Sequence, residues 1–268
     1  MVVGYLLTIS GAVAVMGGLA ARRPELVAGT VGPALIQAGV GIAVFGCLTW
    51  FVGRRALRLS GAELGWATAR DGVAGFGKGL GLAALIGALA LVLGWPMESR
   101  WEFDGGSLAG YLARLPILAA VLLPAAFFEE LAFRGALVAG LARGLGRLGG
   151  LFVSSLLFAL AHRANPSVTP LALVNIALAG VFLGLTFLAR GGLWTATGAH
   201  LGWNLVLAAL AAPVSGLPFE VPWIDFHPGE PAWVTGGNFG PEGGLLGSVA
   251  LVVGAFAVSR WRGNREGT

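Results

Sequence analysis

The chain has 268 residues, of which 56% are hydrophobic and 11% are charged, and its mean hydropathy is +0.82. A soluble domain carries roughly 25% charged residues, so this composition excludes a domain whose whole surface faces water. The net charge of +4 does not indicate nucleic-acid binding, because the arginines lie in short connections between apolar segments, where they set the orientation of a membrane protein.

Several apolar segments approach the length of about 20 residues that a helix needs to cross a bilayer. In chain order they are 3–21, 28–53, 77–95, 110–140, 148–163, 170–189, 193–213 and 245–259. The first carries no Lys or Arg at its start, which is atypical of a cleaved signal peptide, so it is expected to be a true span. The single cysteine, Cys47, excludes a disulfide framework. The sequence therefore predicts an all-α fold, with residues 1–268 forming one polytopic membrane domain of about eight transmembrane helices.

The arginines are distributed unevenly between the two sides of the predicted membrane. With the N-terminus in the cytoplasm, the inner loops and tail hold Arg54, Arg55, Arg58, Arg70, Arg143, Arg147, Arg190, Arg260, Arg262 and Arg265. The outer loops hold Arg22, Arg23, Arg100 and Arg163. Because cytoplasmic loops are enriched in Lys and Arg, we expect both termini in the cytoplasm and the protein in a bacterial inner membrane.

Three charged residues, Glu129, Glu130 and Arg134, lie inside an apolar segment. A charged group at the bilayer centre costs about 2.5–3.5 kcal/mol, so these residues are functional candidates, with a purely structural Glu–Arg pair as the alternative. Residues four apart share a helix face, and Glu130 is therefore predicted to pair with Arg134. Glu129 is rotated by about 100° from Glu130 and is left free for chemistry.

Histidine and asparagine add to this set. His162 ends the fifth apolar segment, and His200 and Asn204 lie four residues apart on one face of the seventh. His227, in the polar segment 214–244, is expected to be a solvated loop residue. Glu and His activate water as general bases or hold a metal, and Asn can donate a hydrogen bond to an oxyanion. The combination suits hydrolysis of a carbonyl compound.

Three motifs follow one another in apolar segments: Glu129–Arg134 has the form EExxxR, Phe158–His162 the form FxxxH, and His200–Asn204 the form HxxxN. In this order they resemble the CAAX-protease and bacteriocin-processing (CPBP, Abi) family of intramembrane metalloproteases, which is related to type II CAAX prenyl endopeptidases. The resemblance covers roughly 110–213, which is therefore expected to be the motif-bearing catalytic core.

The resemblance implies an intramembrane endopeptidase that hydrolyses a peptide bond of a membrane-associated or lipidated protein or peptide. In the family scheme, Glu129 and His162 activate water, and His200 and Asn204 bind the oxyanion. The second Glu and the Arg of the first motif, Glu130 and Arg134, then have supporting roles.

The resemblance also implies a divalent metal such as zinc as a candidate cofactor, with Glu129, His162 and His200 as candidate ligands, although no HExxH motif is present. The expected partners are membrane lipid and a membrane-bound or lipidated substrate, without nucleic acid. Two other functions stay open. One is a non-catalytic membrane scaffold or immunity protein, and the other is a transporter that uses Glu129 and Glu130 as an ion relay.

Two expectations concern geometry. Within these segments Glu129 lies mid-span and His162 lies near the outer end, although the two must meet if they act together. Either the fifth helix extends towards Pro166, or the predicted depths of the two residues in the membrane are wrong by a turn or more. The segment 214–244 is long for a loop, and long loops are usually functional or disordered. We expect it to cover part of the substrate route or to border it, with a passive outer loop as the alternative.

Overall fold

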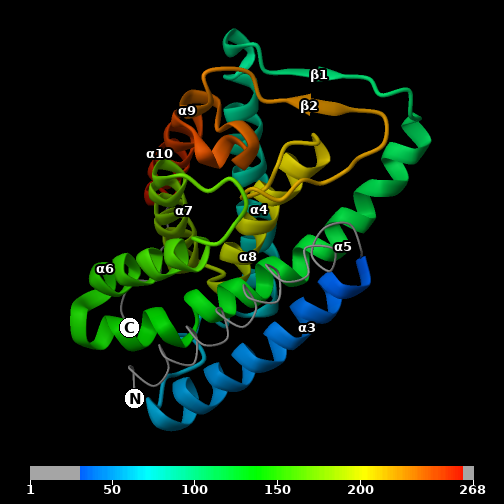
Figure 1. The fold of residues 1–268 in the computed structure, drawn as a ribbon. Coiled ribbons are helices and arrows are strands. Elements are labelled where there is room, and N and C mark those ends of the chain that lie inside the picture. The colour runs from blue at the N-terminus through cyan, green and yellow to red at the C-terminus, as the bar shows by residue number, and fades with distance from the viewer. Residues whose placement is uncertain (1–30, 262–268) are drawn as a thin grey trace.

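The computed structural model describes residues 31–261 as a bundle of α-helices (Figure 1). The long helices are α3 (Val31–Leu48, continued by a π-helix at Thr49–Ala56), α4 (Ala69–Val92), α5 (Leu108–Phe133), α6 (Ala136–Ala161), α7 (Pro170–Leu188), α8 (Leu193–Ala209) and α10 (Leu245–Ser259). The small elements are β1 (Arg100–Glu102), β2 (Asp225–His227), α9 (Ala232–Thr235) and 3₁₀ turns at Trp95–Met97, Gly237–Phe239 and Pro241–Gly243. The predicted all-α fold is confirmed.

Within residues 31–261, four segments are long and apolar enough to cross a membrane. They are Ala34–Ala56, Ala69–Met97, Leu108–Ala161 and Pro170–Leu188. Large apolar side chains such as Ile36 on α3, Leu85 on α4 and Phe256 on α10 are exposed on the outside of the bundle, where lipid would cover them. The protein is therefore an integral membrane protein. The predicted count of eight spans is approximate, and the predicted span 3–21 lies outside the described residues.

The predicted segments 110–140 and 148–163 have wrong boundaries. Helix α5 ends at Phe133, the chain turns at Arg134 and Gly135, and α6 begins at Ala136. Helix α6 is itself kinked at Gly146, where φ is 72° and ψ is 167°, a conformation open to glycine because it has no Cβ. Both changes of direction lie in or beside apolar sequence, and apolar composition alone does not mark the end of a helix.

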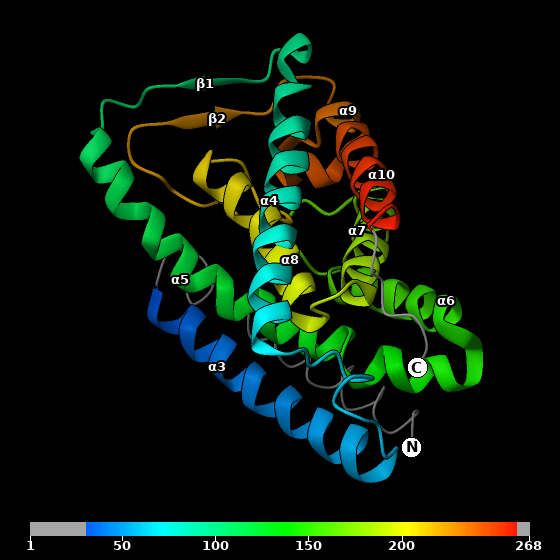
Figure 2. The same ribbon diagram turned by 180° about the vertical axis from the view of Figure 1, so that it is seen from behind.

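Helices α4 and α8 pack backbone against backbone at the centre of the bundle, as Figure 2 shows from behind. A Cβ atom on Gly79 would lie 2.2 Å from the Thr195 carbonyl oxygen, and one on Gly198 would lie 2.2 Å from the Phe76 carbonyl oxygen. One turn further along α8, a Cβ on Gly202 would lie 2.3 Å from the carbonyl oxygen of α4 residue Leu80. Small residues allow this close approach in membrane bundles, so glycine fixes the distance between the two helices.

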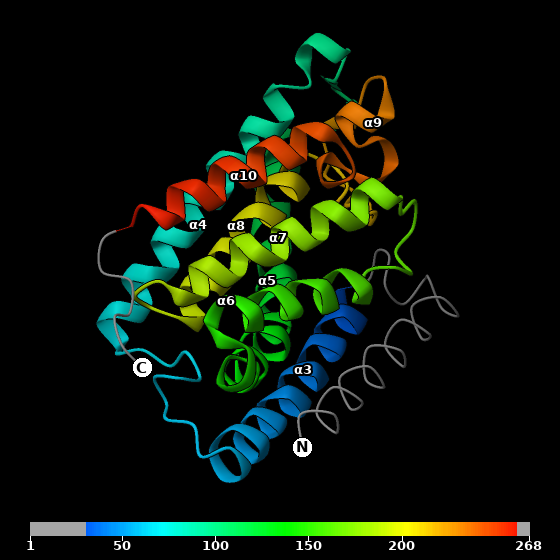
Figure 3. The same ribbon diagram turned by 90° about the vertical axis from the view of Figure 1, so that its left-hand side faces the viewer.

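The other helices surround this central pair. Helix α5 packs against α8 and carries α3 on its outer side, whereas α7 lies between α6 and α10 (Figures 1 and 3). Helix α8 thus contacts α4, α5 and α7. A polar side chain near the middle of α8 is consequently placed at the centre of the molecule.

The two ends of the bundle are held by different contacts. At one end, Arg143 contacts Glu63 at 3.0 Å and Arg190 contacts Asp71 at 2.9 Å. At the other end, β1 and β2 form an antiparallel ribbon with Trp101 opposite Phe226. The Trp101 Nε1 donates a hydrogen bond of 2.9 Å to the carbonyl of Leu210, just beyond α8. The ribbon therefore ties the α4–α5 connection to the end of the central helix.

Candidate active site

The predicted site residues come from three helices. Glu129 and Glu130 lie in the last turns of α5, with Arg134 as its C-cap. His162 is the C-cap of α6, and the remaining two motif residues lie on α8. The structure brings all of them to one region between the helices.

Glu130 is fully buried and joins two of the other residues. Its Oε2 atom lies 3.2 Å from Nε of Arg134, which confirms the predicted pair. Its Oε1 atom accepts a hydrogen bond of 2.8 Å from Nδ1 of His200. The second contact crosses from α5 to α8, so sequence spacing within one helix could not indicate it.

Arg134 is 1% exposed and has three further neighbours. Its Nη2 donates to the carbonyl of Gly180, near the middle of α7, at 3.2 Å. Its guanidinium lies 4.5 Å from the centroid of the Phe158 ring, a cation–π arrangement. The same ring packs edge-on against His200, with centroids 6.0 Å apart. Phe158 of the FxxxH motif thus packs between the arginine and a histidine.

The Glu129 carboxylate lies between two histidines. Its Oε2 atom is 4.0 Å from Nε2 of His162 and 3.8 Å from Nε2 of His200. Within residues 31–261, this Oε2 atom is buried and has no hydrogen-bond partner. Unlike Glu130, the Glu129 side chain keeps 24% of its surface exposed.

Hydrogen bonds fix the orientation of both imidazole rings. The Nδ1 atom of His162 lies 2.7 Å from the Phe158 carbonyl oxygen, and that of His200 lies 2.8 Å from the Glu130 carboxylate. Because a carbonyl and a carboxylate accept hydrogen bonds, each Nδ1 carries a proton. Each ring therefore turns its Nε2 atom towards Glu129.

The proximity of Glu129 and His162 resolves the difference in depth that the sequence suggested. Helix α5 ends at Phe133, so Glu129 lies one turn from the end of its helix instead of mid-span. Helix α6 ends at Ala161 and does not extend to Pro166. The expected helix extension is wrong, and the error lay in the boundaries of the spans.

Glu129, His162 and His200 have the donor types of a zinc site. Tetrahedral bonds of about 2.0–2.1 Å place donor atoms about 3.3–3.4 Å apart, whereas the N···O distances here are 3.8 and 4.0 Å. In the described part of the chain, no group of three His, Cys, Asp or Glu side chains is close enough to hold a metal. The donor types and ring orientations fit a divalent metal, and the distances fit a water molecule that bonds to both partners.

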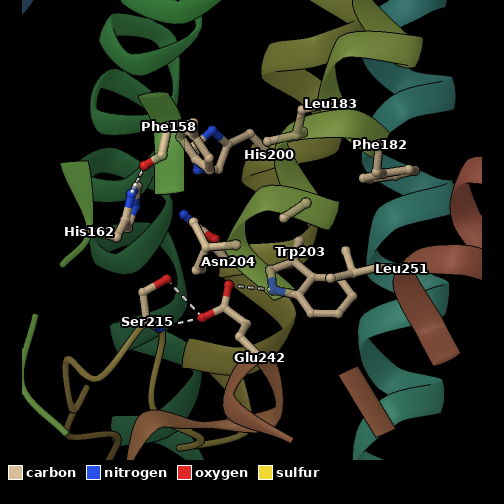
Figure 4. Close-up of a pocket in the computed structure, with 12 residues that line it drawn as sticks. Phe158, His162, Phe182, Leu183, His200, Trp203, Asn204, Ser215, Glu242 and Leu251 are labelled. Atoms are coloured by element: carbon tan, nitrogen blue, oxygen red, sulfur yellow. Dashed lines mark hydrogen bonds between the residues drawn. The ribbon is translucent and has the colours of Figure 1, made fainter. Parts of the chain in front are cut away.

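A cavity of about 20 Å³ opens beside this region (Figure 4), large enough for one water molecule. His162, His200 and Asn204 line it on one side. Phe182, Leu183 and Leu251 form an apolar side. Asn204 thereby shares a cavity with both histidines, as the predicted role of an oxyanion donor requires.

Two of the other residues that line this cavity were missed by sequence reasoning. They are Ser215 and Glu242, from the segment 214–244. Glu242 is 4% exposed; its Oε1 accepts a hydrogen bond of 2.9 Å from Trp203 Nε1, and its Oε2 accepts one of 2.8 Å from Ser215 Oγ. Burial raises the pKa of the Glu242 carboxyl above its ordinary value, and the hydrogen bonds from Ser215 oppose that rise. The segment 214–244 thus contributes two residues to the lining of the cavity.

The polar, Pro- and Gly-rich sequence around Glu242 is typical of a solvated loop and does not predict a buried side chain. The only signal for burial is its position just before the apolar helix α10. His227 lies outside the site, in β2, with its Nε2 atom 3.3 Å from Oε2 of Glu102.

The fold and the site define a class of protein: a polytopic helical membrane protein with Glu and His side chains gathered between its helices. Residues 111–206 match the family model described as Type II CAAX prenyl endopeptidase Rce1-like. This segment contains every predicted site residue, so the family resemblance seen in the motifs is confirmed there. The match shows that this part of the chain is similar to CAAX-type membrane proteases. Comparisons with curated proteins and with solved structures give no match.

Proposed function

We propose that this protein is an intramembrane endopeptidase that hydrolyses a peptide bond of a membrane-associated or lipidated protein or peptide. The observation that carries the proposal is the Oε2 atom of Glu129, which is buried without a hydrogen-bond partner among residues 31–261 and lies within 4.0 Å of the Nε2 atoms of His162 and His200. An unpartnered buried carboxylate oxygen facing two oriented imidazoles is suited to binding and deprotonating water.

In the proposed reaction, Glu129 and His162 hold the attacking water. Their facing atoms are 4.0 Å apart, a gap that a water oxygen spans with hydrogen bonds of about 2.8 Å. Glu129 takes a proton as the water oxygen bonds to the substrate carbonyl carbon. That proton then passes to the leaving amine nitrogen when the C–N bond breaks.

His200 and Asn204 stabilise the oxyanion that forms on the carbonyl oxygen. The Asn204 side chain points into the cavity between His162 and Ser215 (Figure 4), and its amide can donate a hydrogen bond. His200 donates from Nε2 when its ring carries both protons, and Glu130 stabilises that charged ring through Nδ1. Arg134 balances the charge of Glu130. Donors aimed at a developing oxyanion are often the largest single contribution to catalysis.

A divalent metal, where one binds, would be held by Glu129, His162 and His200. It would polarise the substrate carbonyl and lower the pKa of its bound water. The steps above use only the side chains of this chain.

The proposal is tested by cleavage of a peptide panel by the detergent-purified protein, with products identified by mass spectrometry. Each sequence is offered in a lipidated and an unlipidated form, and the Glu129→Gln variant serves as the matched control. We expect the unaltered protein to cleave lipidated peptides and the variant to lose activity by about 10²–10⁴-fold. Equal cleavage by both proteins would refute the proposal.

Metal dependence is tested with the same assay. In the proposed reaction Glu129 and His162 orient the water themselves, so activity should persist after dialysis against a chelator. Metal analysis of the purified protein and readdition of zinc serve as controls. Complete loss on chelation with recovery on zinc addition would show that the three donors close around a metal.

A further inference from the structure

Glu242 lies on the opposite side of the cavity from the EExxxR motif and joins segments far apart in the sequence. Its Oε1 atom accepts from Trp203, the neighbour of Asn204 on α8, and its Oε2 atom accepts from both the backbone and the side chain of Ser215 (Figure 4). All three partners donate to one carboxylate. This arrangement fixes the position of α8 relative to the turn at residue 215.

The turn at Ser215 also reaches the loop that follows His162. Nδ2 of Asn165 donates a hydrogen bond of 2.8 Å to the Ser215 carbonyl, and the backbone N–H of Asn165 bonds to the His162 carbonyl at 3.0 Å. Asn165, Ser215, Glu242 and Trp203 therefore form one connected polar bridge. It begins three residues after His162 and ends one residue before Asn204.

The backbone around the bridge leaves little room for movement. A Cβ atom on Gly216 would lie 2.1 Å from the Pro166 carbonyl oxygen, so the turn is pressed against the loop after α6. From the other side, Nδ2 of Asn175 on α7 donates to the carbonyls of Glu242 and Gly244, at 2.8 Å each. The backbone of Glu242 is thereby fixed independently of its carboxylate.

We propose that Glu242 is a positioning residue, which holds His162 and Asn204 at a fixed separation by joining the loop after α6 to helix α8. The inference rests on the proposed function, because His162 holds the water and Asn204 receives the oxyanion in that mechanism. Reacting groups must keep their geometry closely, since a displacement of about 1 Å can lower a rate by about 10²-fold.

Two variants break the bridge with small changes of shape. Glu242→Gln replaces one acceptor oxygen by an NH₂ group, which then faces donors, because Trp203 Nε1 and the Ser215 N–H both donate to the native carboxylate. Trp203→Phe keeps an aromatic ring and removes the Nε1 donor. The matched controls are Glu230→Gln, an exposed glutamate of the same segment, and Trp101→Phe, whose indole donates to a carbonyl beyond α8.

We expect both bridge variants to lower kcat by about 10²-fold, with KM changed far less, because the bridge orients catalytic groups. Both controls should keep the kcat of the unaltered protein. In an Asn204→Ala background, Glu242→Gln should add little further loss, because residues that act through one another are not additive. Unchanged kcat in Glu242→Gln and Trp203→Phe, or full additivity with Asn204→Ala, would overturn the inference.

Hydrogen exchange gives a readout that needs no substrate. Loss of the bridge should speed amide exchange in 162–166 and 213–217 by about tenfold, while the core of α4 is unaffected and Glu230→Gln shows no change. If the unaltered protein cleaves no peptide but this exchange pattern appears, the proposed function fails and the bridge stands. Unchanged exchange in 162–166 in a folded Glu242→Gln protein refutes the bridge itself.

Discussion

Glu129 and Glu130 are adjacent in the sequence, yet their surroundings differ. Glu130 has no exposed surface and contacts both Arg134 and His200. The Glu129 side chain is 24% exposed and faces the two Nε2 atoms without a hydrogen bond to its Oε2. The contacts of Glu130 join α5 to α8 and stabilise the fold. The Glu129 Oε2 atom is left available to bind a ligand.

Replacement of Glu129 by glutamine should therefore reduce activity, whereas replacement of Glu130 should reduce stability. Glu129→Gln should abolish turnover and leave the melting temperature in detergent within a few degrees of the unaltered protein. Glu130→Gln leaves Arg134 buried without its counter-charge, and breaking one partner of a buried pair costs about 3–5 kcal/mol of folding free energy. Thermal unfolding measured beside turnover distinguishes the two.

The double variant Glu130→Gln with Arg134→Met supplies the control, because it removes the orphaned charge and should recover part of the lost stability. It should stay inactive even when folded, since the His200 ring has lost its carboxylate partner. A stable and inactive Glu130→Gln protein beside an unstable Glu129→Gln protein would reverse the two roles.

Two asparagines near the cavity offer a second comparison. Asn204 lines the cavity, and its removal as Asn204→Ala should lower kcat by about 10²–10³-fold, as for loss of one oxyanion donor, with little change in stability. Asn175 is fully buried and bonds to Glu242, Gly244 and Ser248, so Asn175→Ala should lower the melting temperature first. A stability loss in Asn204→Ala as large as that in Asn175→Ala would contradict a catalytic role for Asn204.

Sequence spacing predicted the contacts that lie within one helix and missed those between segments. The interval from Glu130 to Arg134 corresponds to one helical turn, so their pairing followed from helix geometry alone. The contact from Glu130 to His200 and the burial of Glu242 depend on how α5, α8 and the segment 214–244 meet. No periodicity within a single segment contains that information.

The start of α7 was predicted correctly, whereas α4 begins at Ala69 after the N-cap Thr68, eight residues before the predicted start at 77. The predicted segment 170–189 matches α7, which starts with Thr169 as N-cap, bonded to the Ala172 amide, and with Pro170 in its first turn. Both are helix-start signals. The end of α5 carries one stop signal, Gly135 directly after the C-cap Arg134, and the turn there is stabilised by the buried ion pair and by packing against α7.

The contact between α4 and α8 predicts different effects of neighbouring glycines. Gly79→Ala would place a methyl group 2.2 Å from the Thr195 carbonyl oxygen, and forced overpacking costs about 1–3 kcal/mol or more. Gly81→Ala, on the same helix, meets nothing within 4 Å and should stabilise the helix by up to about 1 kcal/mol. Melting temperatures in detergent test this, and equal shifts in both variants would contradict the packing described.

At the scale of the whole molecule, the two ends differ. The arginine-rich end carries Arg143 and Arg190, each of which joins a helix to a connecting segment, whereas Arg100 lies at the other end, in the ribbon of β1 and β2. The prediction is that the arginine-rich end and both termini face the cytoplasm. A reporter that is active only in the periplasm should stay silent when fused after Thr268.

Cysteine labelling checks the same topology in intact cells, in a Cys47→Ala background. Asp104→Cys, in the exposed connection between β1 and α5, should react with a membrane-impermeant reagent, and Gly144→Cys, at the arginine-rich end, should react only after lysis. The opposite labelling pattern would show that the molecule has the reverse orientation in the membrane, with the same fold.

The glycine contact between α4 and α8 also has a consequence for motion. Rotation of α8 by one residue would turn Ala199 or Trp203 towards the carbonyls that Gly198 and Gly202 now approach, where a side chain does not fit. Helix α8 can therefore neither roll nor slide against α4 without separating from it. His200 and Asn204 therefore keep their position relative to α4, and any opening that admits a substrate must come from elements that pack around the α4–α8 pair.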